Sequence, residues 1–195
     1  LGYIKLSRFS VTSANEVHQA LSKLKKEGMK ALIFDLRDNP GGLMDAAREI
    51  ADEFLVDGQK IVMTKDRKGK ERDYFASSRG LFQDGEVVVI INEGSASASE
   101  IVAGALQDHR RAVVVGRRSF GKGLVQQEMT LSDGSKVRLT TYRYYTPNGR
   151  SIQKPYSSDY DAYQQESLKR NWTEDEDRSE EDARELEKGG IAPER

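Results

Sequence analysis

The sequence predicts an α/β domain in which helices cover a largely parallel central sheet. Short apolar segments alternate with amphipathic ones from residue 1 to residue 115, which is the pattern of repeated strand–helix units. Two of the apolar segments, at residues 31–36 and 87–91, run directly into turns of small residues. Because ligand sites in such sheets lie at the carboxyl ends of strands, we expect the chemistry of this chain at these two turns.

The first strand and helix are predicted by alternation and by a helix start signal. Residues 2–9 place alternate side chains on two faces, as a strand does. Ser13 and Glu16 frame a capping box, in which the Ser13 hydroxyl bonds forward to the backbone and the Glu16 carboxylate bonds back. The helix that follows runs to residue 27, and Gly28 ends it.

A second strand and a second helix follow in the same order. The continuous apolar run at residues 31–36 predicts a buried strand, and the turn at residues 39–42 leads from it into a helix. The inward side of that helix is expected to carry Leu43, Ala47, Ile50 and Phe54. Residues 61–64 then predict a third strand, and the polar residues 66–70 predict a hairpin-like turn.

The second half of the chain contains its most apolar strand. Residues 87–91 (VVVII) predict a buried strand, and the stretch at residues 92–101 (NEGSASASEI) leads from it into a helix. The core side of this helix is expected to carry Ile101, Val102, Ala105 and Leu106. Residues 112–115 predict another strand, and residues 137–142 alternate as a half-exposed strand does.

The composition limits the classes of function. The chain has 195 residues and a formal net charge of -1, so no overall positive charge favours nucleic acid as a partner. It lacks the roughly 18 consecutive apolar residues of a membrane span, and a membrane partner is not indicated. The absence of cysteine excludes disulfides, thiolate metal sites and a cysteine nucleophile. His18 and His109 are the only histidines, which restricts the choice of a catalytic base.

The C-terminal part of the chain differs in composition from the rest. Residues 174–187 contain nine acidic residues against two arginines. We expect residues 1–156 to form the folded core and residues 157–188 to form a charged, acidic and solvated insertion. An acidic docking arm is the alternative, and no other feature of the sequence supports it. Residues 189–195 (GGIAPER) predict the start of a returning core segment that leads into a further strand.

The serine-rich stretch at residues 92–101 raises the question of a serine nucleophile. A serine hydroxyl needs a neighbouring base to attack at neutral pH. His109 lies twelve residues after Ser97 on the same expected helix, roughly 18 Å along its axis, and His18 lies among exposed polar residues. A Ser–His–Asp triad is therefore not expected, and lysine remains as the base.

Lys122 is the lysine whose surroundings best fit that role. A lysine accepts a proton only as the neutral amine, which an apolar or glycine-rich setting favours. Most lysines of this chain lie in solvated clusters, whereas Lys122 lies between two glycines and precedes the apolar pair Leu124 and Val125. Gln126, four residues later, could hold the amine through its amide oxygen. A plain surface turn is the alternative for this segment.

Backbone amides at the two turns are expected to stabilise an oxyanion. Amides at a helix start are ready donors, so the Ala98 N–H next to Ser97 is one of them. A second donor would come from Gly41 or Gly42, because a turn without side chains allows a close approach. The alternatives are structural: a tight connection at the glycine turn, and helix capping by the serines.

Four motifs together resemble the carboxyl-terminal processing peptidases, also called tail-specific proteases. They are Asn39-Pro-Gly-Gly42, Gly94-Ser-Ala-Ser-Ala-Ser-Glu100, Gly121-Lys-Gly-Leu-Val-Gln126 and Tyr145-Thr-Pro-Asn-Gly-Arg-Ser-Ile-Gln153, in this order within residues 1–155. The resemblance implies a serine endopeptidase that cleaves protein substrates near their C-terminus through an acyl-enzyme. It also implies a crotonase/ClpP-like ββα core, so that residues 1–156 would be the peptidase catalytic core.

The resemblance implies a role for each site residue. It makes Ser97 the nucleophile, Lys122 the general base and Gln126 the residue that orients the lysine. The oxyanion hole would consist of the Ala98 N–H and one glycine N–H of the turn at residues 39–42. No cofactor and no metal are implied.

The resemblance also implies partners and a location. Members of this family usually carry a PDZ domain before the core, which recognises the C-terminus of the substrate, so we expect one in the full-length protein. The acidic residues 157–188 fall where shorter relatives pass directly to the Gly-Gly-Ile-x-Pro segment. Because the family usually acts in the periplasm, the cell envelope or an equivalent lumen, we expect an extracytoplasmic location, although this sequence shows no targeting signal.

Two other functions stay open at this point. A non-cleaving module on the same core would bind extended peptides without cutting them. A crotonase-type acyl-CoA enzyme would share the fold and the oxyanion site but would not need Lys122 or Gln126. Labelling of Ser97 by a fluorophosphonate and binding of CoA distinguish the three functions.

Overall fold

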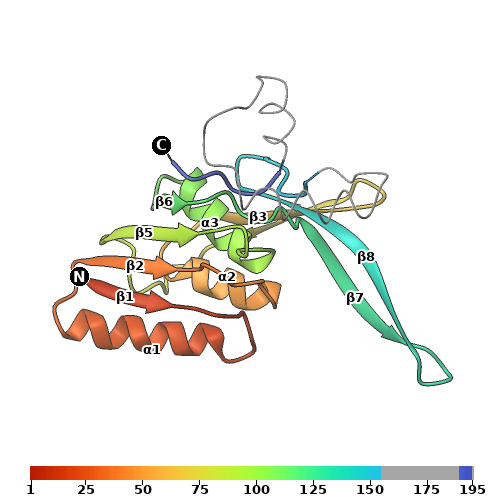
Figure 1. Cartoon of the computed structure of the whole chain (residues 1–195), viewed down its shortest axis with the longest axis horizontal. Helices are drawn as coiled ribbons and strands as arrows, with labels where there is room; N and C mark the ends of the chain where they lie inside the picture. The colour runs from red at the N-terminus through yellow and green to blue at the C-terminus, as the bar shows by residue number, and fades with distance from the viewer. Residues whose placement is uncertain (155–188, 195) are drawn as a thin grey trace.

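A four-stranded parallel sheet forms one half of the molecule in the computed structural model, which describes residues 1–154 and 189–194 (Figure 1). In spatial order its strands are β1 (Gly2–Lys5), β2 (Ala31–Asp35), β5 (Glu86–Ile91) and β6 (Val113–Gly116). All neighbouring strands run parallel, and Asp35 of β2 lies opposite Ile90 of β5. The carboxyl ends of β2 and β5 therefore lie side by side, and the turns that follow them meet.

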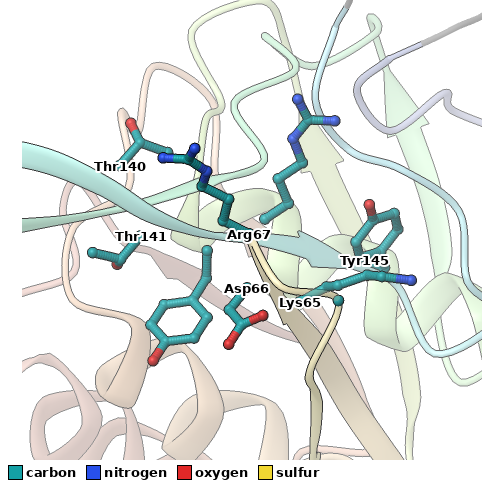
Figure 2. Close-up of a pocket in the computed structure, with 9 residues that line it drawn as sticks. Lys65, Asp66, Arg67, Thr140, Thr141 and Tyr145 are labelled. Carbon is teal, nitrogen blue, oxygen red and sulfur yellow. The ribbon is translucent and has the colours of Figure 1, made fainter.

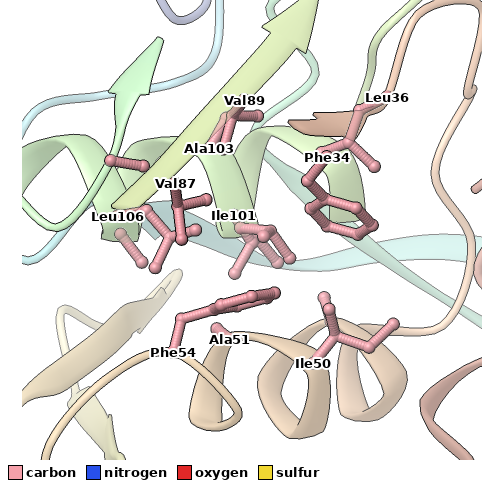
Figure 3. Close-up of a cluster of buried hydrophobic side chains, with 14 of the residues drawn as sticks. Phe34, Leu36, Ile50, Ala51, Phe54, Val87, Val89, Ile101, Ala103 and Leu106 are labelled. Atoms are coloured by element: carbon pink, nitrogen blue, oxygen red, sulfur yellow. The ribbon is translucent and has the colours of Figure 1, made fainter. Parts of the chain in front are cut away.

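Three helices bury their apolar sides in the core of this half. They are α1 (Ser13–Lys26), α2 (Met44–Asp52) and α3 (Ala98–Asp108). The first nine residues of α3, 98–106, are all buried. Figure 3 shows Ile101 of α3 close to Phe34, Ile50 and Phe54, and the rings of Phe34 and Phe54 lie 5.8 Å apart between centroids. This core holds the start of α3 in a fixed place behind the turn that follows β5.

A second sheet is antiparallel throughout. In spatial order its strands are β4 (Glu71–Phe75), β3 (Lys60–Asp66), β8 (Lys136–Tyr145) and β7 (Leu124–Thr130). The β7–β8 hairpin extends away from the body of the molecule (Figure 1). Most of its residues are exposed, but its base carries the buried side chains of Leu124 and Tyr144. Within the described residues, β7 is an edge strand.

The parallel sheet and its helices confirm the predicted α/β class. The end of α1 is also confirmed, since Gly28 follows it with a φ of 86°. The capping box predicted for Ser13 and Glu16 is wrong, because the Ser13 hydroxyl donates to the Arg8 carbonyl at 2.9 Å and no side chain caps α1. The inward position predicted for Leu43 is also wrong, since Leu43 precedes α2 and is 47% exposed.

The antiparallel sheet is a correction to the fold predicted from the sequence. The expected central sheet was largely parallel, but the strands of the described residues form one parallel and one antiparallel sheet of four strands each. Strands β4 (ERDYF) and β7 (LVQQEMT) consist mostly of polar residues, and no regular apolar alternation marks them. The half-exposed strand predicted at residues 137–142 is confirmed as part of β8.

Residues 189–194 return to the core beside β6. The Ser119 N–H donates to the Ile191 carbonyl at 3.1 Å, and the Glu194 N–H donates to the Val114 carbonyl at 2.8 Å. The acidic insertion expected at residues 157–188 lies outside the described residues. In the part of the chain that the structure describes, no helix has the length and apolar character needed to cross a bilayer.

Candidate active site

Ser97 has a backbone conformation that serine rarely adopts. Its φ of 58° and ψ of -112° lie in a region that glycine enters far more readily, and the residue stands directly before α3. Such a conformation costs about 1–3 kcal/mol, and it clusters at functional sites, where the surrounding structure holds it in place. Ser97 is half-buried, whereas Ala96 and Ala98 on either side are buried. The turn therefore presents the Ser97 side chain at a sharp bend.

The structure distinguishes the three serines of the turn. The Ser95 hydroxyl donates to the Leu36 carbonyl at 2.7 Å, and the Ser99 hydroxyl donates to the Asn39 carbonyl at 2.9 Å. Both of these serines are completely buried. Their hydroxyls fasten the turn after β5 to the turn after β2, which leaves Ser97 as the serine that reaches the surface.

The glycine turn after β2 lies directly against Ser97. Asn39 accepts the Ala96 N–H on its carbonyl at 3.0 Å and the Gly41 N–H on its side-chain oxygen at 2.9 Å. The Gly42 N–H and the Ala98 N–H have no hydrogen-bond partner within the described residues. These two amides are therefore available to a ligand, whereas the amide of Gly41 is occupied.

Gly41→Ala tests how closely the two turns pack. A Cβ at Gly41 would lie 2.5 Å from the Ala96 carbonyl oxygen and 2.8 Å from the Ala98 nitrogen, at a φ of 90°. We expect the free energy of unfolding in urea to fall by about 3 kcal/mol. Gly134→Ala is the matched control, because Gly134 has a φ of 83° with nothing within 4 Å, and it should lose about 1 kcal/mol. Equal losses would contradict the close packing.

The Glu100 carboxylate joins the Ser97 turn to the segment that carries Lys122. It is completely buried. It accepts hydrogen bonds from the N–H groups of Ser97 at 2.7 Å, Gly121 at 2.7 Å and Lys122 at 2.8 Å, and from the Ser119 hydroxyl at 2.6 Å. Burial raises the pKa of this carboxyl, and the four donors act in the opposite direction. One side chain thus holds the backbone of both predicted catalytic residues.

Glu100→Gln is expected to lower the free energy of unfolding by about 2 kcal/mol. The new amide NH₂ group faces N–H donors, so at least one buried donor loses its acceptor. Urea denaturation measures the loss. Glu93→Gln is the control: Glu93 pairs with the largely exposed Arg117, and its substitution should cost less than about 1 kcal/mol. A loss no larger for Glu100→Gln than for Glu93→Gln would remove the support for this bridging role.

Ser97, Lys122 and Gln126 line one cavity of about 390 Å³. Gly42 lines it as well, together with Leu43, Met44, Leu124, Val125, Glu128, Arg138 and Tyr144. Lys122 is half-buried, and Gln126 is exposed on strand β7. No hydrogen bond between the side chains of Ser97, Lys122 and Gln126 is present in residues 1–154. The structure therefore brings the three predicted residues to one cavity without a hydrogen bond between their side chains.

Tyr144 belongs to the surroundings of Ser97 and was not predicted from the sequence. Its hydroxyl lies 2.8 Å from Ser97 Oγ, and its side chain is 3% exposed. Burial raises the pKa of Tyr144 to about 12; the bond with Ser97 opposes the rise, and the Glu100 charge adds to it. The alternation at residues 137–142 predicted a half-exposed strand next to Tyr144. It does not distinguish Tyr144 from the more exposed Tyr142 two residues earlier.

Neither histidine lies at this cavity. His18 Nδ1 is 2.6 Å from the Glu53 carboxylate, and His109 Nε2 donates to the Lys60 carbonyl at 2.6 Å. Both imidazoles are therefore engaged elsewhere in the fold. That the base is not a histidine stays a prediction.

A different cavity, of about 460 Å³, lies between the β3–β4 turn and β8 (Figure 2). Lys65, Arg67 and Tyr145 are among the residues that line it. The Lys65 amine already binds the Glu71 carboxylate at 2.9 Å. No residue of the two small-residue turns lines this cavity.

Residues 1–161 match the family described as peptidase family S41. This chain belongs to peptidase family S41. The S41 chain is 46% identical to the carboxy-terminal-processing protease of Bartonella bacilliformis over 158 residues, which cover 78% of the chain and 36% of that protein. It is 45% identical to the carboxyl-terminal-processing protease of Synechocystis sp. over 154 residues, which cover 79% of the chain and 36% of that protein.

A solved structure shows the same relationship. The S41 chain is similar to the photosystem II D1 C-terminal processing protease, with a TM-score of 0.73 and 39% identity. The similarity covers 77% of this chain and 39% of that protein. The S41 chain thus spans about a third of the length of the curated relatives it matches.

Proposed function

We propose that this S41 chain is the catalytic core of a serine endopeptidase with a Ser97–Lys122 pair, which cleaves protein substrates near their C-terminus. The observation that carries the proposal is the setting of Ser97. It is a strained residue at a helix start, in a cavity that Lys122 also lines, beside the available amides of Gly42 and Ala98. The relatives named as carboxyl-terminal processing proteases support the same activity.

In the proposed reaction the Ser97 hydroxyl attacks the carbonyl carbon of the scissile peptide bond. The neutral Lys122 amine takes the hydroxyl proton as the new bond forms, and gives it to the leaving nitrogen as the C–N bond breaks. Water then hydrolyses the acyl-enzyme, and its proton passes through Lys122 back to Ser97. The flexible four-carbon stem of Lys122 allows its amine to move onto Ser97 Oγ when the substrate enters.

Gly42, rather than Gly41, is the proposed second donor of the oxyanion hole. The Gly41 N–H already binds the side chain of Asn39, whereas the Gly42 N–H is available along with that of Ala98. Two donors aimed at the developing oxyanion stabilise the transition state. Gln126 lines the same cavity, and in this proposal its amide oxygen orients the Lys122 amine.

The walls of the cavity favour an extended peptide as the ligand. Leu124 and Val125 of strand β7 line the cavity, and among the described residues this strand has no neighbour on its outer side, so its backbone can pair with a substrate strand. Leu43 and Met44 add apolar surface. By analogy with the carboxyl-terminal processing peptidases, we expect small or apolar side chains near the cut, and these four apolar residues fit that preference.

The wider organisation of the protein forms part of the proposal. Residues 1–156 make up the catalytic core with a crotonase/ClpP-like ββα architecture, residues 157–188 an acidic insertion and residues 189–195 a returning core segment. The full-length protein carries a PDZ domain that binds the C-terminal region of substrates, and it acts in the periplasm or cell envelope. The resemblance to carboxyl-terminal processing peptidases supports these assignments.

A fluorophosphonate probe tests the proposed function. The 195-residue chain is incubated with the probe and, in a second reaction, with an unfolded protein, and mass spectrometry locates the adduct and the cut sites. We expect one adduct, on Ser97, and new chain ends in the unfolded protein. The absence of both the adduct and the cleavage would contradict the proposal.

The same experiment separates the other two functions. Binding of an extended peptide with neither an adduct nor cleavage would favour a non-cleaving peptide-binding module, for which the lack of a hydrogen bond between Ser97 and Lys122 is the supporting observation. Binding of CoA in calorimetry, without cleavage of protein, would favour an acyl-CoA enzyme.

A further inference from the structure

We propose that Tyr144 is a further catalytic residue of this site: its hydroxyl donates a hydrogen bond to Ser97 Oγ and holds this atom while Lys122 removes the proton. The inference rests on the proposed function and adds a residue that the Ser–Lys pair does not include. The observation that carries it is the distance of 2.8 Å between Ser97 Oγ and the Tyr144 hydroxyl, deep at the base of the β7–β8 hairpin.

The direction of this hydrogen bond follows from the two groups. A phenol is a stronger acid than an aliphatic hydroxyl, so Tyr144 is the better donor of the pair. Within the described residues the Tyr144 hydroxyl has no other partner that could accept its proton. When Tyr144 donates, Ser97 keeps its own proton free for transfer to Lys122. The bond thus leaves the nucleophile ready to react.

The position of Tyr144 is held from two sides. Its ring is 3% exposed and packs within the hydrophobic core. Its N–H donates to the carbonyl of Gly123, the residue after Lys122, at 2.9 Å. Burial raises the pKa of the phenol to about 12, so it stays protonated throughout the neutral range. The donor therefore keeps both its proton and its place relative to the segment that carries the base.

The proton count of the reaction does not change. Ser97 Oγ forms its bond to the carbonyl carbon, its proton passes to Lys122 and then to the leaving nitrogen, and the Tyr144 proton stays on the phenol. As Ser97 Oγ loses its proton it gains negative charge, and a hydrogen bond to a charged acceptor is stronger than one to a neutral acceptor. The bond therefore stabilises the transition state more than the ground state, which is the condition for a faster reaction.

Tyr144→Phe removes the donor and keeps the ring. In the 195-residue chain we measure the rate at which a fluorophosphonate labels Ser97 from about pH 6 to 10, and kcat and KM with an unfolded protein. We expect the plateau rate and kcat to fall about tenfold, with little change in KM or in the pH midpoint, because Tyr144 acts on Ser97 and not on substrate binding. Tyr142→Phe is the control and should react like the unsubstituted chain.

The other possible results of the Tyr144→Phe experiment would overturn the inference, and each would show a different role for Tyr144. An unchanged rate in Tyr144→Phe would show that the bond has no catalytic role, and a faster rate would show that it holds Ser97 in a resting state. Complete loss of labelling in a folded variant would make Tyr144 the base itself. No labelling of the unsubstituted chain would instead contradict the proposed function, and the inference would fall with it.

A second variant keeps the inference testable if Tyr144→Phe does not fold. 3-Fluorotyrosine at position 144 preserves the hydroxyl and makes the phenol a stronger donor. We expect its labelling rate at neutral pH to equal or exceed that of the unsubstituted chain. A rate that falls about tenfold would overturn the proposed donor role.

Discussion

Ser97→Ala is expected to lower the turnover of an unfolded protein substrate by about 10⁴- to 10⁶-fold. The substitution removes the hydroxyl that forms the acyl-enzyme in the proposed reaction. The neighbouring Ser95 and Ser99 cannot replace it, because their hydroxyls are buried and bonded to backbone carbonyls. Cleavage is measured by the appearance of new chain ends with time. Turnover at the unsubstituted rate would exclude Ser97 as the nucleophile.

Ser99→Ala provides the matched control in the same turn. The Ser99 hydroxyl holds the Asn39 carbonyl and does not line the Ser97 cavity. We expect its loss to reduce the free energy of unfolding by about 1 kcal/mol. Fluorophosphonate labelling of Ser97 should persist in this variant, and circular dichroism should show both variants folded. The pair separates the chemical role of one serine from the structural role of the other.

Lys122→Ala is expected to lower turnover by about 10²- to 10⁴-fold, because the proton of Ser97 then has no base to accept it. Lys122→Arg sharpens the test. The guanidinium keeps the positive charge but does not deprotonate in proteins, so the arginine variant should be as slow as the alanine variant. Turnover restored by arginine would show that Lys122 supplies charge rather than a basic nitrogen.

The pH profile gives an independent measurement of the same role. Only a neutral amine accepts a proton, and a higher pH favours the neutral form of an amine. Labelling of Ser97 in the unsubstituted chain should therefore increase with pH between about pH 6 and 9. The Lys122→Ala variant should lose this slope, whereas a flat profile in the unsubstituted chain would count against a lysine base.

The parallel half of the fold could be predicted because burial leaves a strong mark in the sequence. Strands β2 and β5 are the two central strands of the parallel sheet, and all their residues except Glu86 are buried or half-buried, so they appear as largely apolar runs at residues 31–36 and 87–91. Strand β7 needs no such run, since beyond Leu124 and Val125 its side chains are exposed. Its pairing with β8 depends on backbone hydrogen bonds that any residue except proline can make.

The start of α1 illustrates a second limit. A capping box is a local pattern, but the Ser13 hydroxyl meets the Arg8 carbonyl and the Ser10 N–H before it can reach the helix backbone. Which of these groups binds the hydroxyl depends on the path of the preceding loop. That path follows from the docking of the whole helix, which the local sequence does not reveal.

The sequence indicated several residues of the candidate site, but it did not indicate the contacts between them. The turn of small residues and the glycine-flanked lysine predicted Ser97 and Lys122 as site residues, and both line one cavity in the structure. The choice of Gly42 over Gly41 needed the orientation of the Asn39 side chain. Tyr144 comes from the other sheet, 47 residues beyond Ser97, so only the packed structure could reveal it.

The Glu100 carboxylate has a consequence for how the protein comes to be active. It binds the amides of Gly121 and Lys122, so the lysine segment is anchored only after the chain beyond α3 has folded back. The glycine turn, in the same way, meets Ser97 only once β2 and β5 have paired. A partly synthesised or partly unfolded copy therefore lacks the assembled site. Under the proposed function, folding is therefore the step that assembles the site, and a copy that loses its structure also loses the proposed activity.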